Sequence, residues 1–280
     1  MPRTRKLLPE GRSSMRKLVC LVSLFLMVSL LFSVSALAGS ALDRIIKKGE
    51  LAVGTSGTQP PMSATNKKGE LMGMDVDLSK AMADAMGVKL RFVQMPFAEL
   101  VPALEAGKVD MVLSGMTITA ERNKKAAFLG PYIVTGKGIL AVEARFAALK
   151  EAKGLDAPEV KVAALKDSTS QKFAETSMSK AKLTLFGSYD EAIDLLLKNK
   201  IDVIVADFQF CALTAYRHQK KGLIAGQSPL TFEPLGIAMP EDALLINWVQ
   251  NFLNQYQGTG ELKKTSEKWL NPGSWVDDLP

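Results

Sequence analysis

Histidine and cysteine are scarce in this 280-residue sequence, which contains one histidine, His218, and two cysteines, Cys20 and Cys211. No metal-ligand cluster, glycine-rich phosphate loop or nucleophile-base pair is recognisable, so we expect no cofactor and no metal. His218 stands beside two lysines and is expected at the surface, whereas Cys211 is expected to pack in the core. If Cys20 is removed with a signal segment, no internal disulfide can form, and a core of about 240 residues must stabilise the protein.

Most of the chain also lacks an excess of either basic or acidic residues, although the formal net charge of the whole chain is +6. Residues 1–38 hold six of the 35 Lys and Arg residues and one of the 29 acids, which leaves 29 basic and 28 acidic residues, or +1. The five Lys-Lys pairs are spread along the sequence and do not form a basic stripe. We therefore expect no nucleic-acid partner.

The one long apolar run, from Leu18 to Leu37, has the features of a secretory signal. Arg16 and Lys17 precede it, and the small-x-small sequence Ala36-Leu37-Ala38 follows. This order predicts a signal peptide over residues 1–38, cleavage after Ala38 and a periplasmic protein, with an uncleaved membrane anchor as the alternative. Met15 begins a complete signal by itself, so residues 1–14 are predicted to be a mis-assigned start or a dispensable extension. No later run is long enough to cross a bilayer.

After the signal, predicted strands and helices alternate, which predicts an α/β protein with mostly parallel sheets covered by helices. The extended, glycine-containing run from Tyr132 to Val142 predicts a crossing between two lobes, 39–137 with 232–280 and 138–231. The expected strands are 51–55, 89–95, 110–113, 160–165, 182–186, 201–206 and 231–239. The expected helices are 41–48, a segment from Met74 to Met86, 97–106, one from about 168 to 178, one starting at Ser188, 208–218, 247–256 and 261–269. Ser168 with Gln171, and Ser188 with Glu191, have capping-box spacing.

The segment from Ser114 to Arg122 carries the clearest functional signal. It follows the predicted strand 110–113, and ligands of open α/β sheets bind beyond the carboxyl ends of the strands. Thr119 can cap a short helical turn that begins at Ala120, and the Arg122 guanidinium is suited to a carboxylate. These features predict a site for a small carboxylate ligand; the alternative is a simple cap and a solvated surface charge.

Asp207 directly follows the apolar strand 201–206, so a carboxylate is expected at the opening of the second sheet. It could bind an ammonium group or could cap the helix that follows. Together with Arg122 it would bind both charges of an amino acid. Three further polar positions follow predicted strands at the same edges, namely Thr55, Ser56 and Lys166.

These residues resemble the family 3 extracellular solute-binding proteins of polar amino-acid ABC importers. The resemblance covers nearly all of the chain after residue 38, and the segments that carry it are Leu51–Thr55, Gly73–Leu78, Val101–Asp110 and Ser114–Arg122 with Phe128. It implies a type II periplasmic-binding-protein fold, in which two α/β lobes are joined by two hinge strands and close on a ligand. It also implies a monomer that delivers an amino acid to a membrane permease.

The resemblance further implies that Arg122 binds the ligand α-carboxylate, assisted by Thr117 and by amides near Gly115 and Ser170. Asp207 would bind the α-ammonium. Phe97 would pack against the ligand side chain, with a core position as the alternative, and Lys166 would reach the far end of that side chain. The remaining expected site residues are Ser114, Ser56 and Met62.

Departures from the family pattern bear on specificity. An acid is often found where Ser56 stands, and an aromatic where Gln59 and Met62 stand; without the acid, a cationic side chain lacks a partner. Lys166 favours an acidic or amide side chain instead, and Met62 would make an adaptable wall. The segment Asp167-Ser168-Thr169 lacks the glycine usual in the family, which puts contacts from the second lobe in question.

Two other functions remain open. A few relatives of this fold dehydrate cyclohexadienyl carboxylates, and Asp207 or Glu233 could protonate a leaving hydroxyl in such a reaction. A sensory module that docks on a receptor is the second alternative, and it requires a separate partner. The binding protein is the function we expect, with no enzyme activity.

Overall fold

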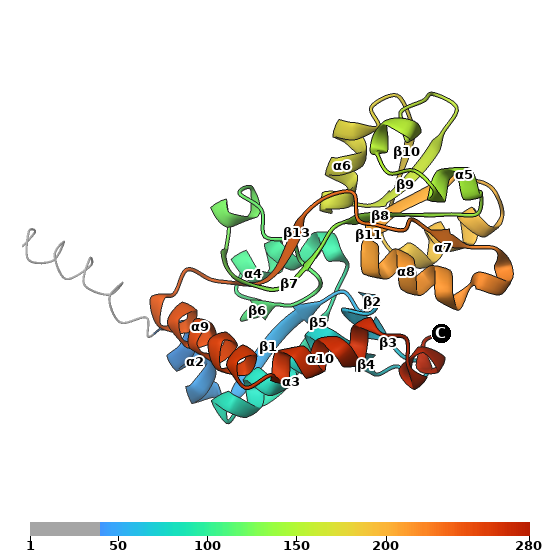
Figure 1. Ribbon diagram of the computed structural model, residues 1–280. Coiled ribbons are helices and arrows are strands. Elements are labelled where there is room, and N and C mark those ends of the chain that lie inside the picture. The colour runs from blue at the N-terminus through green and yellow to red at the C-terminus, as the bar shows by residue number, and fades with distance from the viewer. Residues whose placement is uncertain (1–39) are drawn as a thin grey trace, which may run out of the picture. The chain divides into compact units, whose positions relative to one another are not determined.

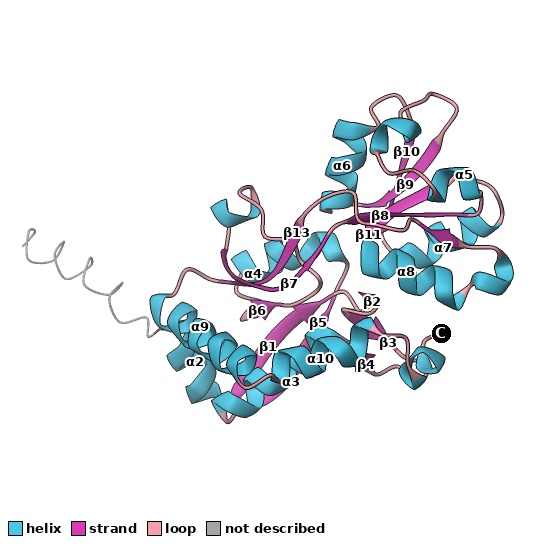
Figure 2. Cartoon of the chain, in the orientation of Figure 1, coloured by secondary structure: helices cyan, strands magenta, loops and turns pink. Residues whose placement is uncertain are grey.

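The computed structural model describes residues 40–280, which form two α/β lobes, each with a five-stranded sheet and helices packed against it (Figures 1 and 2). The α/β class and the two-lobed architecture are thereby confirmed. The expected signal segment, residues 1–38, lies outside the described residues. Among the helices of residues 40–280, none combines the length and the apolar character needed to cross a membrane.

The sheet of the first lobe has the strand order β5-β1-β6-β13-β7. Its strands are β1 (Glu50–Thr55), β5 (Lys89–Gln94), β6 (Met111–Val112), β7 (Ala127–Thr135) and β13 (Glu233–Met239). β1 pairs in parallel with β5 and β6, whereas β13 runs antiparallel to β6 and β7. The strands expected at 51–55, 89–95 and 231–239 are confirmed within two residues, and the one expected at 110–113 is reduced to two residues.

The sheet of the second lobe has the order β10-β9-β11-β8-β12. Its strands are β8 (Lys137–Ala141), β9 (Lys161–Leu165), β10 (Lys182–Phe186), β11 (Val203–Asp207) and β12 (Ile224–Ala225). β9 pairs in parallel with β10 and β11, and β8 runs antiparallel to β11 and β12. β11 is buried along its whole length, as its apolar sequence predicts.

Both sheets are mixed, with less parallel pairing than the expectation of mostly parallel sheets. The reason lies in the connections. β8 follows β7 directly across the lobe boundary, and β13 returns from the second lobe, so neither enters its sheet through the helical crossover that parallel neighbours require. Two of the four strand pairs in each sheet are antiparallel for this reason.

The hinge places two chain segments in close contact. A Cβ atom on Gly136, between β7 and β8, would overlap the carbonyl oxygen of Thr231 on the returning segment. Glycine is therefore required by this close approach. The lobe limits 39–137 with 232–280 and 138–231 stay a prediction, although β8 starts at Lys137 and β13 at Glu233.

The helices agree with the expected order along the described chain. In the first lobe they are α2 (Ala41–Lys48), α3 (Met74–Met86), η2 (Phe97–Glu99), α4 (Leu100–Glu105), η3 (Arg122–Lys124), α9 (Ala243–Gly258), α10 (Glu261–Leu270) and η6 (Ser274–Asp278). In the second they are α5 (Ala144–Ala147), η4 (Ala152–Leu155), α6 (Thr169–Ser177), α7 (Tyr189–Leu197), α8 (Phe208–Arg217) and η5 (Gln219–Lys221). Met74 and Met82 are fully buried in the core of the first lobe.

The helix expected over 97–106 is divided into η2 and α4. Ser168 caps α6 by accepting a hydrogen bond from the Gln171 backbone nitrogen at 3.2 Å, as expected. Ser188 stands at the N-cap of α7 but makes no side-chain cap bond, so that capping prediction is wrong.

A small antiparallel sheet, β2 (Thr58–Gln59), β3 (Ser63–Thr65) and β4 (Leu71–Met72), follows β1. The sequence predicts only a loop over residues 56–61. The strand β2 fixes the backbone of Gln59, whose side chain then reaches across to the second lobe.

Candidate functional site

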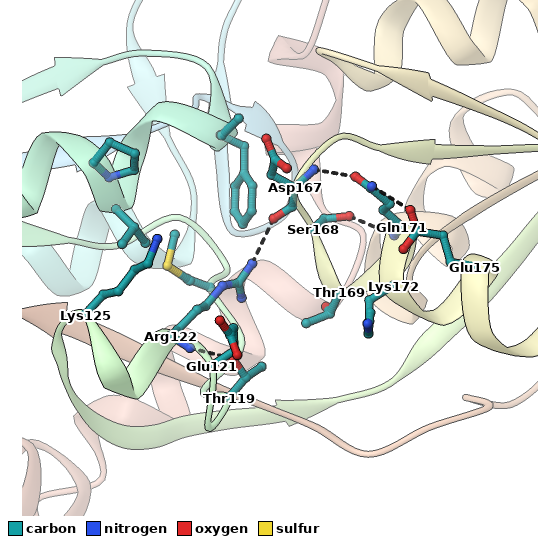
Figure 3. A pocket seen from close by; sticks show the side chains of 15 residues that line it. Thr119, Glu121, Arg122, Lys125, Asp167, Ser168, Thr169, Gln171, Lys172 and Glu175 are labelled. Atoms are coloured by element: carbon teal, nitrogen blue, oxygen red, sulfur yellow. Dashed lines mark hydrogen bonds between the residues drawn. The ribbon is translucent and has the colours of Figure 1, made fainter.

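Two neighbouring cavities lie where polar segments follow the carboxyl ends of β6, β9 and β11. The larger has a volume of about 640 Å³ and the smaller about 10 Å³. Both are lined by residues of the two lobes, and four residues line both, namely Phe97, Arg122, Ser168 and Thr169. Figure 3 shows the larger cavity, with Arg122 and Thr119 facing Asp167 and Thr169. The expected position of a ligand site at these strand ends agrees with this arrangement.

Arg122 is held by carbonyl groups from both lobes. Its Nη1 donates to the Thr117 carbonyl at 2.9 Å and its Nη2 to the Asp167 carbonyl at 3.3 Å. The guanidinium carbon lies 5.5 Å from the centre of the Phe97 ring. The backbone nitrogen of Arg122 donates to Thr119 Oγ1 at 3.1 Å, so Thr119 does cap this turn, although η3 begins two residues later than expected. Thr119 therefore caps the turn, and the guanidinium of Arg122 is at the same time held in place by the two carbonyl groups.

The surroundings of Arg122 favour an anionic partner. Burial lowers the pKa of Arg122, because the charged form loses water, while the charges of Asp207 and Glu233 partly offset this effect. A guanidinium nevertheless remains protonated in proteins. The Arg122 guanidinium is partly removed from water, and it has N–H donors besides the two that bind carbonyl groups. It can therefore bind a carboxylate.

The amino end of α6 forms the opposite side of the smaller cavity. Ser168, Thr169 and Ser170 line that cavity, and Ser170 is buried. Thr169 Oγ1 lies 3.3 Å from Thr117 Oγ1 of the first lobe. Because the first backbone amides of a helix lack helical partners and its amino end favours negative charge, this end adds to the anion preference of Arg122.

Asp207 ends β11 and is held by two donors. Lys137 Nζ lies 2.6 Å from Oδ1, and Gln59 Nε2 donates to Oδ2 at 2.7 Å. Asp207 stands at the N-cap of α8 without a side-chain cap bond, so the alternative role as a helix cap is wrong. The carboxylate does bind an ammonium group, but that group belongs to the protein.

The sequence interpretation missed Gln59, Lys137 and Tyr189, all of which line the smaller cavity. Lys137 could have been found, because it is a charged residue inside an otherwise apolar extended run predicted to cross between lobes. Its side chain is 1% exposed. Gln59 and Tyr189 carried no comparable signal, since their approach depends on the folding of β2 and α7.

Gly115 does not offer its amide to a ligand as expected. Its backbone nitrogen donates to Asp75 Oδ2 at 2.6 Å, while Tyr132 Oη donates to Asp75 Oδ1 at 2.7 Å. Gly115 lines the smaller cavity with a backbone φ of +58°, a left-handed conformation that favours glycine. Its contribution is therefore the shape of the loop after β6. Burial raises the pKa of Asp75 to about 7, and the bonds from Tyr132 and Gly115 oppose that rise.

Four other expected site residues line neither cavity. Ser56 and Ser114 are buried and bind each other, with 3.0 Å between their Oγ atoms, so they join the loops after β1 and β6. Met62 is buried against Gly115. Lys166, which directly follows β9, is exposed. The structure thus brings together Arg122, Thr117, Phe97, Ser170, Asp207 and Gly115, and leaves out Ser56, Ser114, Met62 and Lys166.

Neither His218 nor Cys211 lines these cavities. Cys211 is fully buried, and burial raises the pKa of its thiol. Burial and the charges of Arg217 and Lys221 lower the pKa of His218. Within residues 40–280, no group of three or more His, Cys, Asp and Glu residues could hold a metal ion.

The chain is similar to a known protein family and to several solved structures. The model of the bacterial extracellular solute-binding proteins, family 3, matches residues 51–272. A solved ancestral amino-acid-binding protein, a precursor of cyclohexadienyl dehydratase, is 38% identical with a TM-score of 0.76; the match covers 83% of this chain and 100% of that chain. A binding component of an ABC transporter from Wolinella succinogenes, complexed with lysine, is 34% identical with a TM-score of 0.78. That match covers 82% of this chain and 99% of the solved chain.

A curated relative of another kind is the cyclohexadienyl dehydratase of Pseudomonas aeruginosa, which is 29% identical over 234 residues, or 82% of this chain and 86% of the relative. The solved neighbours confirm the two-lobed fold implied by the sequence resemblance.

Proposed function

This chain belongs to family 3 of the bacterial extracellular solute-binding proteins, and on that basis we propose that it captures a polar amino acid between its lobes. The observation that supports this proposal is that Arg122 and Asp207, residues of opposite charge from different lobes, line one cavity. The ligand α-carboxylate binds Arg122 and the α-ammonium binds Asp207. A periplasmic location after cleavage at Ala38, delivery to the permease of an ABC transporter, and a monomeric state complete the proposal.

Lobe closure follows from the contacts across the site. Three of the hydrogen bonds that join the lobes involve residues lining the two cavities: Gln59 to Asp207 at 2.7 Å, Arg122 to the Asp167 carbonyl at 3.3 Å, and Thr117 with Thr169 at 3.3 Å. The smaller cavity, about 10 Å³, holds about one water molecule, so an amino acid enters only when the lobes separate. A bound amino acid then replaces these bonds with its own and favours closure, which is the state a permease would recognise.

The larger cavity bears on the ligand side chain. Its charged lining residues are three acids and three bases: Glu121, Asp167 and Glu175, with Arg122, Lys125 and Lys172. This lining has no excess of either charge sign, so it favours a neutral polar side chain, such as an amide, over a cationic or an anionic one. The preference for an acidic side chain was based on Lys166, which lines neither cavity, so we propose the neutral amide class.

A thermal-shift screen of the twenty amino acids on refolded, ligand-stripped protein tests this function. Ligand at about 100 times its dissociation constant adds about 2.7 kcal/mol of stability, which corresponds to a rise of about 5 to 10 °C in Tm for a domain of this size. We expect the largest rise with an amide amino acid such as glutamine. If no amino acid raises Tm, the proposal is wrong.

A dehydratase is the second candidate, because one relative has that activity. The reaction needs an acid that protonates a leaving hydroxyl. Both Asp207 oxygens accept hydrogen bonds, one from Lys137 and one from Gln59, so the carboxyl group is bound within the protein and not directed at a leaving hydroxyl. Glu233 is buried and lines neither cavity. These contacts favour binding without catalysis.

Incubation with prephenate decides between the two functions. We expect no phenylpyruvate above the uncatalysed rate in a spectrophotometric assay. If the wild-type protein forms phenylpyruvate above that rate and Glu233→Gln does not, the protein is an enzyme instead.

A further inference from the structure

Lys137 is a buried lysine with two possible carboxylate partners. Its side chain is 1% exposed, and its Nζ lies 2.6 Å from Asp207 Oδ1 and 3.5 Å from Glu233 Oε2. A buried ammonium is unfavourable unless it is paired and hydrogen-bonded. Lys137 must therefore stay bound to one of these two carboxylates.

The Lys137 ammonium stands where a ligand ammonium would bind. Asp207 has two carboxylate oxygens, and Lys137 and Gln59 hold one each. Asp207 and Lys137 line the same small cavity as Arg122. A ligand ammonium can bind Asp207 closely only if the Lys137 ammonium gives up its position.

Glu233 can receive the displaced ammonium. Its Oε1 accepts from Thr231 Oγ1 at 3.2 Å, whereas its Oε2 is buried and has no hydrogen-bond partner. A charge-assisted bond is about 2.8 Å long, so Nζ needs to approach Oε2 by less than about 1 Å. A rotation of the lysine side chain can supply this movement without a change in the strand.

We propose that Lys137 is a specificity-determining residue, an internal ammonium that competes with the ligand ammonium for Asp207 and moves to Glu233 when an amino acid binds. This inference rests on the proposed function. After the exchange every charge is paired: ligand carboxylate with Arg122, ligand ammonium with Asp207, and Lys137 with Glu233. A carboxylate without an α-ammonium binds Arg122 and leaves Lys137 on Asp207. Lys137 thus lowers the preference of the site for amino acids over carboxylates that lack an α-ammonium.

Two ligand pairs that differ in the α-ammonium test the exchange. L-glutamine is compared with glutaramate, and L-lysine with 6-aminohexanoate, by calorimetry on wild type, Lys137→Met, Glu233→Gln and the control Lys182→Met. Lys182 is an exposed lysine at the edge of the second sheet. Circular dichroism confirms the fold of each variant.

We expect Lys137→Met to raise the ratio of amino-acid to deaminated-acid affinity about 10-fold, because Asp207 Oδ1 becomes free for the ligand ammonium. Glu233→Gln should lower that ratio about 10-fold, because the displaced ammonium loses its carboxylate partner, and Lys182→Met should leave it unchanged. An unchanged or reversed ratio in Lys137→Met, or no binding of either pair to any variant, overturns the inference. If the ratio is unchanged in Lys137→Met but L-glutamine or L-lysine still binds, the proposed function stands; if neither amino acid binds to any of the proteins, the proposed function is wrong as well.

Discussion

Replacing Arg122 with alanine is expected to lower amino-acid affinity about 100-fold, or about 3 kcal/mol. The ligand carboxylate loses its charge-assisted partner, and the negative charges of Asp207 and Glu233 near the site lose a compensating cation. Calorimetry with the amino acid that gives the largest rise in Tm measures this loss. Arg122→Lys should recover only part of the affinity, because an ammonium cannot donate to the Thr117 and Asp167 carbonyls and also bind a carboxylate with two parallel bonds.

Lys124→Ala is the matched control for Arg122→Ala. Lys124 lies on the same short helix, η3, and its exposed side chain pairs with Glu121 at 3.4 Å. Removal of this surface charge should change affinity less than about 2-fold, because exposed ion pairs contribute little. Undiminished binding in a folded Arg122→Ala protein would show that the carboxylate binds elsewhere.

Replacing Asp75 with alanine is expected to destabilise the protein by about 4 kcal/mol. The substitution leaves the Gly115 amide and the Tyr132 hydroxyl buried without their acceptor, and each unsatisfied group costs about 1 to 3 kcal/mol. Urea unfolding measures the loss. Tyr132→Phe removes one of the two donors and should cost less. Equal stability of Asp75→Ala and wild type would mean that these two bonds contribute nothing to the fold.

Asp75 also predicts a pH dependence. Burial raises its pKa from 3.8 to about 7 in the folded protein, so between these values the folded state keeps a proton that the unfolded state loses. Stability from this group is therefore complete at low pH, falls as pH rises towards 7, and is constant above it. A protonated carboxyl can still accept from Gly115 and donate to the Tyr132 oxygen, which is consistent with this direction.

Asp75→Asn isolates that effect from the other titrating groups. The stability of wild type relative to Asp75→Asn should be about 3 kcal/mol greater at pH 5 than at pH 8. Urea unfolding at the two pH values provides the comparison. A difference independent of pH would show that Asp75 is ionised across this range.

Much of the site followed from local sequence. The polar segment after a short buried strand predicted the position of Arg122, and the acid after a fully apolar strand predicted that of Asp207. Their roles in binding stay predictions. Lys166, Ser56 and Met62 were expected by position along the family pattern, but the direction of each side chain depends on neighbours that are distant in the sequence.

The sequence alone determined the α/β class, the two lobes and the strand ends at which opposite charges stand, because these depend on hydrophobic periodicity and short motifs. Only the tertiary structure decided which of these charged groups already have a partner within the protein. Lys137 and Gln59 lie 70 and 148 residues from Asp207 along the chain and yet hold both of its oxygens. Such pairing follows from the way the hinge strand β8 and the hairpin strand β2 meet β11, and buried charges bind the partners that folding brings within reach.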